Sequence, residues 1–253
     1  RLASLLERIT RIQGDFWIRL LYLHPDHFPY EILPVAQADT RILPYFDLPF
    51  QHASPKVLRA MNRRGGSEQY QTLIKTIRGA LPGAAIRSTF LCGFPGETEE
   101  DFQVLLDFQQ AAALTWIGCF RYSPEEGTPA AAHAATLGAV PSRKTAARRQ
   151  EALERAQVPI TARFLDALLD RQATVLVEAA AEAGAGVLVN AEENLYLGRL
   201  ACSAPDVDGG VIIQTKNTLT PGTFARGVIR GRSGFDLLMA APSVCGNGKG
   251  AGG

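Results

Sequence analysis

Apolar and polar positions over the first 130 residues follow a pattern typical of alternating strands and helices. Apolar runs rich in strand-forming residues cover 16–23, 42–50, 85–92 and 116–122. The segments between them place apolar residues at helical spacing. This alternation predicts a parallel sheet or a (β/α) barrel with helices on its outer face. Four strands are too few to close such a barrel, so we expect a partial one.

Two short helices are expected between the second and third strands. Ser54 is placed to cap the first of them, with Pro55 in its first turn. Ser67 is placed to cap the second, which would end at Pro82-Gly83. The pattern thus predicts a side-chain cap at the start of each helix.

The pattern divides the chain into four parts. Residues 1–140 form the predicted partial barrel, and 141–171 form a charged helical connector that Pro159 interrupts and whose basic residues face solvent. Over 172–240, five or six short apolar runs separated by turns predict a small antiparallel β-barrel of the oligonucleotide-binding class. The Gly-rich segment 241–253 is expected to be a flexible tail.

Composition and hydropathy bear on whether the protein has a membrane role. The 253 residues carry a formal net charge of +1, and no apolar run reaches the length of about 18 residues that a membrane span needs. We therefore expect no membrane role and, by default, a cytoplasmic location. The chain begins with Arg1 inside a helical pattern, which predicts that it is a piece of something longer.

The four cysteines are spread widely along the chain. Cys92, Cys119, Cys202 and Cys245 are too far apart for a loop that binds a metal or a cluster, and they suggest no disulfide framework. Cys92 and Cys119 lie in apolar strands, so they are interpreted as small buried apolar side chains. No metal ligand is predicted in this chain.

A glycine-proline turn joins the third predicted strand to a helix. The turn comprises 93–96, and Thr98 is placed to cap the helix together with Asp101. Gly93 and Gly96 would let the backbone approach a bound molecule. Such turns often serve chain reversal alone, but this one lies at the carboxyl end of a strand, where parallel sheets bind ligands.

Four segments, in this order and spacing, resemble the radical S-adenosylmethionine (SAM) methylthiotransferases. They are Pro44-Tyr45-Phe46-Asp47-Leu48-Pro49-Phe50-Gln51-His52-Ala53-Ser54, Leu58-Arg59-Ala60-Met61-Asn62-Arg63-Arg64-Gly65, Gly93-Phe94-Pro95-Gly96-Glu97-Thr98-Glu99-Glu100-Asp101-Phe102 and Tyr122-Ser123-Pro124-Glu125-Glu126-Gly127-Thr128-Pro129-Ala130. The resemblance implies an α/β fold in which the later strands of a radical SAM (β/α) barrel precede an OB-like TRAM barrel. It also implies a transferase that uses SAM.

The same resemblance implies a [4Fe–4S] cluster that grips SAM, held by three cysteines in a C-x-x-x-C-x-x-C loop. This chain has no such loop, so it is expected to be inactive by itself, and no catalytic residue can be named. The residues expected to form the SAM wall lie at strand ends. They are Gln51, His52, Gly93, Phe94, Pro95, Gly96, Tyr122 and Ser123.

Three local features favour one branch of the family. The segments 47–54, 125–126 and 204–209 resemble the sequences of the branch that methylthiolates an aspartate of a small-subunit ribosomal protein (RimO). They are less similar to those of the tRNA-modifying branch (MiaB). Residues 170–240 carry eight acidic and six basic side chains, a net charge of −2, which suits a basic ribosomal protein bound through the TRAM barrel better than tRNA. A tRNA methylthiotransferase or a non-catalytic fragment that binds RNA or protein is the alternative.

Overall fold

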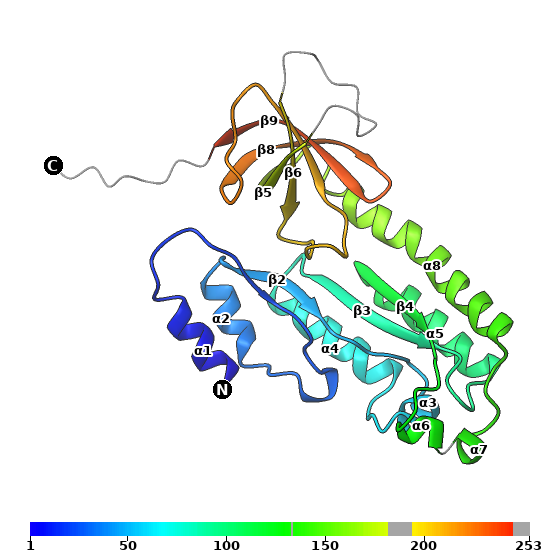
Figure 1. Cartoon of the computed structure of the whole chain (residues 1–253). Helices are drawn as coiled ribbons and strands as arrows, with labels where there is room; N and C mark the ends of the chain where they lie inside the picture. The colour runs from blue at the N-terminus through cyan, green and yellow to red at the C-terminus, as the bar shows by residue number, and fades with distance from the viewer. Residues whose placement is uncertain (133, 182–193, 245–253) are drawn as a thin grey trace. The chain divides into compact units, whose positions relative to one another are not determined.

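The computed structural model describes residues 1–132, 134–181 and 194–244 and divides into two compact units (Figure 1). Unit 1 comprises Arg1–Ile12 and Ile18–Thr161, and unit 2 comprises Gln13–Trp17 and Ala162–Gly253. Unit 1 is an α/β sheet domain and unit 2 contains a closed β-barrel. The predicted fold class is confirmed.

Unit 1 is built on a parallel sheet whose four strands are neighbours in chain order. The strands are β1 (Ile18–Leu20), β2 (Ile42–Asp47), β3 (Ala85–Cys92) and β4 (Trp116–Arg121). The four predicted strands are therefore confirmed. The first is shorter than expected, since β1 comprises only three residues of the apolar run 16–23.

Four of the helices of the sheet domain contribute side chains to the core on one face of this sheet. They are α1 (Leu2–Ile9), α2 (Ile32–Ala38), α4 (Ser67–Ala80) and α5 (Glu99–Ala112). Shorter turns of helix connect the elements: η1 (Pro25–His27), α3 (Pro55–Ala60), α6 (Pro129–Ala132) and α7 (Ala134–Leu137). Figure 1 labels the α-helices of this domain.

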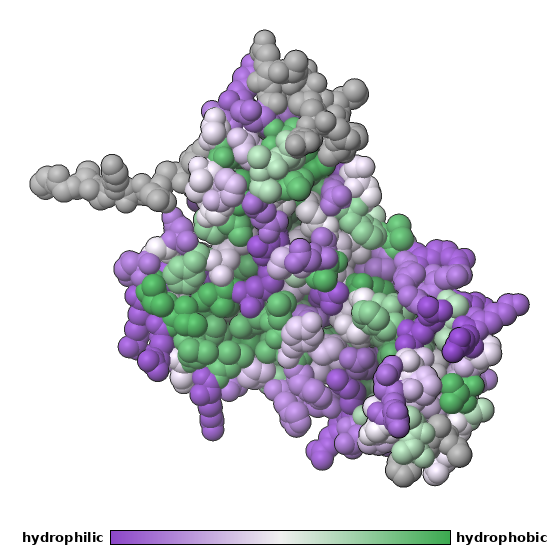
Figure 2. Space-filling view, in the orientation of Figure 1, coloured by the Kyte–Doolittle hydropathy of each residue, from purple (hydrophilic) through white to green (hydrophobic). Residues whose placement is uncertain are grey.

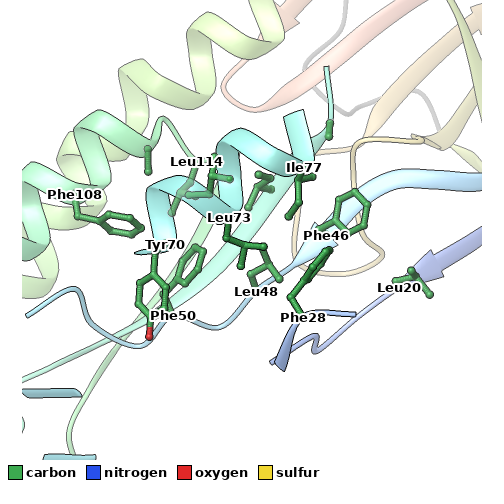
Figure 3. Close-up of a cluster of buried hydrophobic side chains, with 14 of the residues drawn as sticks. Leu20, Phe28, Phe46, Leu48, Phe50, Tyr70, Leu73, Ile77, Phe108 and Leu114 are labelled. Atoms are coloured by element: carbon green, nitrogen blue, oxygen red, sulfur yellow. The ribbon is translucent and has the colours of Figure 1, made fainter. Parts of the chain in front are cut away.

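The core between sheet and helices is rich in aromatic rings (Figure 3). Phe50 of the segment after β2 contacts Tyr70 of α4 and Phe108 of α5, with ring centroids 4.5 and 5.4 Å away. Phe90 of β3 completes the group at 6.3 Å from Phe108. Offset and edge-on contacts of this kind stabilise a core beyond the burial of apolar area. They fix the strand ends that carry the candidate site.

Neither of the two predicted serine caps is present. Ser54 precedes α3, but its hydroxyl donates to Asp101 Oδ1 at 2.6 Å instead of capping the helix. Ser67 is already the first residue of α4, whose N-cap is Gly66. A long-range hydrogen bond thus displaced the expected local one at Ser54, and local sequence carries no sign of this competition.

The expected connector is a single helix, α8 (Arg143–Asp166), with Pro159 inside it. The prediction that Pro159 interrupts the helix was wrong. Buried polar contacts hold this region: the Gln157 amide donates to the Leu114 carbonyl at 2.7 Å, and the Thr161 hydroxyl donates to the Thr115 carbonyl at 2.8 Å. These bonds anchor the helix on both sides of the missing proline N–H.

Unit 2 contains a five-stranded closed barrel in the order β5-β6-β7-β9-β8. Its strands are β5 (Gln172–Ala181), β6 (Asn194–Leu200), β7 (Val211–Thr215), β8 (Phe224–Ser233) and β9 (Asp236–Val244). All neighbouring strands are antiparallel except β7 and β9, which are parallel. The prediction of a purely antiparallel barrel was therefore wrong for this one pair. A further expected strand at 186–189 lies outside the described residues.

Two boundaries of this unit differ from the sequence prediction. Strand β9 continues to Val244, so 241–244 are part of the barrel sheet and not of a tail, while 245–253 lie outside the described residues. Trp17, expected in the first strand of the sheet, instead packs its ring 4.8 Å from Phe224 at the start of β8. Residues Gln13–Trp17 therefore group with the barrel.

Strand β1 forms one edge of the sheet, as expected for a partial barrel. Apolar side chains near it and on α1 are exposed, among them Leu5, Ile12 and Leu21. Figure 2 shows a broad hydrophobic area in the region of α1 and α2. Among the described residues, none of the helices combines the length and apolarity required to cross a membrane.

Candidate functional site

The turn after β3 folds as the sequence predicted and caps its own helix. Gly93 and Gly96 both have a φ of 79°, the left-handed region that glycine adopts without strain. The Thr98 hydroxyl accepts from the Asp101 N–H at 3.2 Å, and the Asp101 carboxylate accepts from the Thr98 N–H at 3.0 Å. This reciprocal pair confirms the predicted capping box of α5.

The glycines of this turn let the chain approach itself. A side chain at Gly96 would overlap the carbonyl oxygen of Leu137, and the Gly96 N–H donates to the Ala139 carbonyl at 3.0 Å. A β-carbon at Gly93 would lie 2.8 Å from the β-carbon of Ala146 in α8. At Gly96, the backbone that was expected to approach a ligand therefore contacts the segment that leads into α8.

A buried carboxylate binds the amide groups of the turn. The Gly93 and Phe94 N–H groups both donate to Glu97 Oε2, the second at 3.0 Å. The other oxygen, Oε1, lies 3.0 Å from Arg149 Nη1, and both side chains are buried. These N–H groups are thus satisfied within the protein.

Arg149 joins this cluster from α8. Its guanidinium lies 5.4 Å from the Phe102 ring and donates to Glu99 Oε2 at 3.1 Å. The expectation that the basic residues of this stretch all face solvent was therefore wrong for Arg149. A signal was present in the sequence, because Arg149 lies in the same helical stripe as Ala146 and Leu153, which are buried.

The two residues that follow β2 hold the strand end in place. Gln51 has a φ of 68° and bridges to β3: its N–H donates to the Thr89 carbonyl and its carbonyl accepts from the Leu91 N–H, both at 2.8 Å. His52 is fully buried, and its Nδ1 accepts from the Ser54 N–H at 3.0 Å. Its Nε2 lies 4.0 Å from Glu97 Oε1, so the histidine borders the buried cluster.

Tyr122 and Ser123 follow β4 on the other side of the turn. The Tyr122 N–H donates to the Cys92 carbonyl at 2.8 Å, and its ring meets Phe94 edge-on at 5.3 Å. Within the described part of the chain, the buried Tyr122 hydroxyl has no hydrogen-bond partner. Ser123 is exposed.

A cavity of about 610 Å³ lies between the end of β4 and the start of α8. Its size is in the range of small-molecule sites. Three of the eight predicted residues line it, namely Gly93, Tyr122 and Ser123. The other five, Gln51, His52, Phe94, Pro95 and Gly96, do not line it. Arg121 and Arg143 add positive charge to its wall.

Asp101 links α5 to α3 through a charged network. Besides its capping bonds, it accepts from the Ser54 hydroxyl at 2.6 Å and from Lys56 Nζ at 2.7 Å. Burial opposes ionisation of Asp101, but the hydrogen bonds from Lys56, Ser54 and Thr98 outweigh burial and lower the pKa of this carboxyl well below its usual value.

The lowered pKa of Asp101 predicts a pH-dependent contribution to stability. A carboxyl with a depressed pKa stabilises the fold above its unfolded pKa, which is about 3.9, and loses this effect as the pH falls. Asp101→Asn is therefore expected to destabilise the protein at pH 7, with the difference shrinking below about pH 4. Urea unfolding at several pH values measures it. Asp107→Asn, on the exposed side of α5, should show no such trend.

A second group of polar side chains lies on the face of the sheet opposite the hydrophobic core. Tyr45 and Asp47 flank the core residue Phe46 in β2, and Arg87 is the register partner of Asp47 in β3. Arg19 of β1 stacks on the Tyr45 ring at 4.4 Å. Burial raises the pKa of Asp47, an effect that Arg87 partly offsets. This charged face matches the interior that the partial barrel predicts.

The two cofactors that the resemblance implies, SAM and a [4Fe–4S] cluster, differ in how well the described residues fit them. Among these residues, no group of three or more His, Cys, Asp and Glu side chains is placed to hold a metal ion. They therefore do not fit an iron–sulfur cluster. The cavity, which Gly93, Tyr122 and Ser123 line, is of a size that fits a small molecule such as SAM.

Comparison with known families accounts for both units. The sequence profile of the radical SAM superfamily matches residues 3–108, and that of the TRAM domain matches residues 171–241. Residues 3–108 thus carry a radical SAM domain and residues 171–241 a TRAM domain. The barrel of unit 2 is accordingly a TRAM barrel.

Curated relatives confirm the methylthiotransferase resemblance. The chain is 43% identical to the ribosomal protein uS12 methylthiotransferase RimO of Treponema denticola, over 95% of this chain and 52% of the relative. It is 40% identical to the RimO of Pelotomaculum thermopropionicum, over 93% and 50%. The chain spans about half the length of these relatives.

A solved structure with partial similarity is coproporphyrinogen III oxidase (HemN) from Escherichia coli, described as a radical SAM enzyme. It is 15% identical, with a TM-score of 0.47, over 64% of this chain and 36% of that chain.

Proposed function

We propose that this chain is the carboxyl-terminal portion of a radical SAM methylthiotransferase that modifies an aspartate of a small-subunit ribosomal protein. The observation that carries the proposal is the 43% identity to a uS12 methylthiotransferase over 95% of the chain. The cytoplasm, where ribosomal proteins are made, is the compartment that this function implies.

In this proposal the chain supplies one wall of the SAM site. Gly93, Tyr122 and Ser123 line the cavity and would hold the cofactor. The Tyr122 hydroxyl is buried and has no partner among the described residues, so it would donate a hydrogen bond to the cofactor after a turn of its ring toward the cavity. The Phe94 and Tyr122 rings, packed edge-on, would exclude water from one side of it. The radical chemistry of the family comes from SAM, and the described residues offer no ligands for the cluster that activates it.

The remaining predicted residues act indirectly in this proposal. Gln51 ties the end of β2 to β3, and His52 lies beside Glu97, whose carboxylate holds the amide groups of Gly93 and Phe94. Pro95 and Gly96 shape the turn itself. We assign these residues to positioning of the wall, and no residue of this chain to a catalytic step.

The charges of the TRAM barrel support a protein substrate over tRNA. Arg199 pairs with Glu178 at 2.8 Å and Arg232 with Asp166 at 2.7 Å. Arg230 also lies 3.2 Å from Asp170. Cations that are already paired contribute less to phosphate binding, because counterion release depends on neutralising phosphates. The barrel thus suits a basic protein partner.

The function is tested with the polypeptide encoded by the complete reading frame, reconstituted with iron and sulfide without oxygen. It is incubated with SAM, a reductant and either ribosomal protein uS12 or tRNA. Mass spectrometry should find a methylthio group on an aspartate of the protein. Modification of tRNA alone would assign the chain to the tRNA-modifying branch. No modification of either substrate would support a non-catalytic binding role.

The proposed SAM contact of Tyr122 is tested by removing its hydroxyl. Tyr122→Phe in the complete protein is expected to weaken SAM binding about threefold to tenfold, because one hydrogen bond contributes about 0.5–1.5 kcal/mol. Calorimetric titration measures the affinity. Tyr30→Phe is the matched control, since Tyr30 is half exposed and does not line the cavity. Equal affinities for all three proteins would remove Tyr122 from the site.

A further inference from the structure

Two cysteines of the sheet domain lie side by side on adjacent strands. Cys92 ends β3 and Cys119 lies in β4, and their Sγ atoms are 3.5 Å apart. Phe90 is the register partner of Cys119, so the two cysteines are offset along the parallel pair. Both side chains belong to the helix-facing side: Cys92 is part of the core and Cys119 packs against it.

The two thiols differ in their access to solvent. Cys92 is completely buried, whereas Cys119 is partly exposed and lines the cavity beside Gly93 and Tyr122. A small oxidant that enters the cavity therefore meets Cys119 first. Cys92 lies directly behind it, at a distance from which its sulfur can attack an oxidised neighbour.

We propose that Cys92 and Cys119 form a reversible disulfide when a hydroperoxide enters the cavity. This proposal is independent of the function assigned above. In the first step the Cys119 sulfur attacks the O–O bond, giving a sulfenic acid and releasing the alcohol, or water when the oxidant is hydrogen peroxide. In the second step the Cys92 sulfur attacks the sulfenic sulfur, the S–O bond breaks and water leaves. Two thiols lose two electrons in total, which reduce the O–O bond.

Cys92 and Cys119 are offset by two positions along the parallel pair, so the bond requires the strand end that carries Cys92 to shift, and it would have a local consequence. A disulfide has an S–S distance of about 2.05 Å, so the sulfurs must approach by roughly 1.5 Å. The Cys92 carbonyl accepts the Tyr122 N–H, and Cys92 immediately precedes Gly93. The bond would therefore link the turn after β3 to β4 at the wall of the cavity.

The pKa of the Cys92 thiol controls the rate of the second step. In the reduced protein, the hydrogen bond with Cys119, together with burial, raises the pKa of the Cys92 thiol above its usual value, and the burial is the part that persists once Cys119 is oxidised. The thiolate is the nucleophile in disulfide formation, so the step is expected to accelerate as the pH rises. The sulfenic acid at Cys119 should accordingly live longer at low pH.

The test treats the reduced protein with hydrogen peroxide, blocks remaining thiols with N-ethylmaleimide and maps the cysteines by proteolysis and mass spectrometry. A Cys92–Cys119 link that a dithiol reductant reverses is the expected result. Cys202→Ser, a matched control outside the sheet domain, should form the link as the wild type does. Cys92→Ser should instead accumulate a sulfenic acid at Cys119, detected with dimedone.

Three outcomes overturn the proposal. They are unmodified thiols at both positions after treatment, a Cys119 sulfenic acid that persists beside an intact Cys92, and a link that joins either cysteine to Cys202 or to another molecule. The mapping of the wild-type protein needs no variant, so the proposal can fail even if Cys92→Ser does not fold.

Discussion

Replacing Arg149 by methionine is expected to lower the free energy of unfolding by about 3–5 kcal/mol. The substitution leaves the Glu97 carboxylate, which is fully buried, without the guanidinium 3.0 Å away. Breaking a buried ion pair by removing one partner costs more than the pair contributes, because the remaining charge has lost its water. Chemical denaturation measures the effect. The same variant should also loosen the turn that Glu97 holds.

The neighbouring Arg148 provides the matched control. It lies on the same helix and also pairs with Glu99, at 2.8 Å, but its side chain is 64% exposed. Exposed ion pairs contribute little, so Arg148→Met should cost less than about 1 kcal/mol. The double variant Glu97→Gln/Arg149→Met should be less destabilised than the sum of the two single variants, since the two residues interact directly. Equal costs for Arg148→Met and Arg149→Met would contradict the buried cluster.

Gly96→Ala is expected to destabilise the protein by about 2–5 kcal/mol. The left-handed conformation of Gly96 costs an alanine about 1–2 kcal/mol, and overpacking adds about 1–3 kcal/mol. The overpacking arises because the new methyl group would overlap the backbone carbonyl of Leu137, which cannot rotate away as a side chain could. Thermal and urea unfolding measure the loss.

Gly83→Ala separates the two contributions. Gly83 has a φ of 81°, close to that of Gly96, but nothing lies within 4 Å of its added β-carbon. It should therefore lose only the conformational part, about 1–2 kcal/mol. If the two variants are equally stable, the segment at 137–139 does not pack on the turn in solution.

The sheet could be predicted from the sequence because its signals are local. The apolar runs at 42–50, 85–92 and 116–122 end at turn residues, and the Thr98/Asp101 capping box spans only four positions. These patterns record propensities that tertiary contacts did not override. The barrel of unit 2 was likewise visible from its spacing of short strands.

The site was only partly predictable because its decisive contacts join distant positions. The sequence placed Gly93, Tyr122 and Ser123 at strand ends, and the structure brings them to one cavity. Nothing local indicates that the Arg149 guanidinium reaches Glu97, 52 positions earlier, or that Ser54 prefers Asp101 to its own helix. Buried polar pairs of this kind depend on the packing of whole elements.

The Trp17 contact with Phe224 means that unit 2 is not assembled from one continuous piece of polypeptide. Almost the entire sheet domain is interposed between Trp17 and the first barrel strand along the chain. An excised fragment that starts at residue 171 would leave the Phe224 ring without its aromatic neighbour. Transplanting the barrel to another protein therefore requires carrying a short upstream peptide with it.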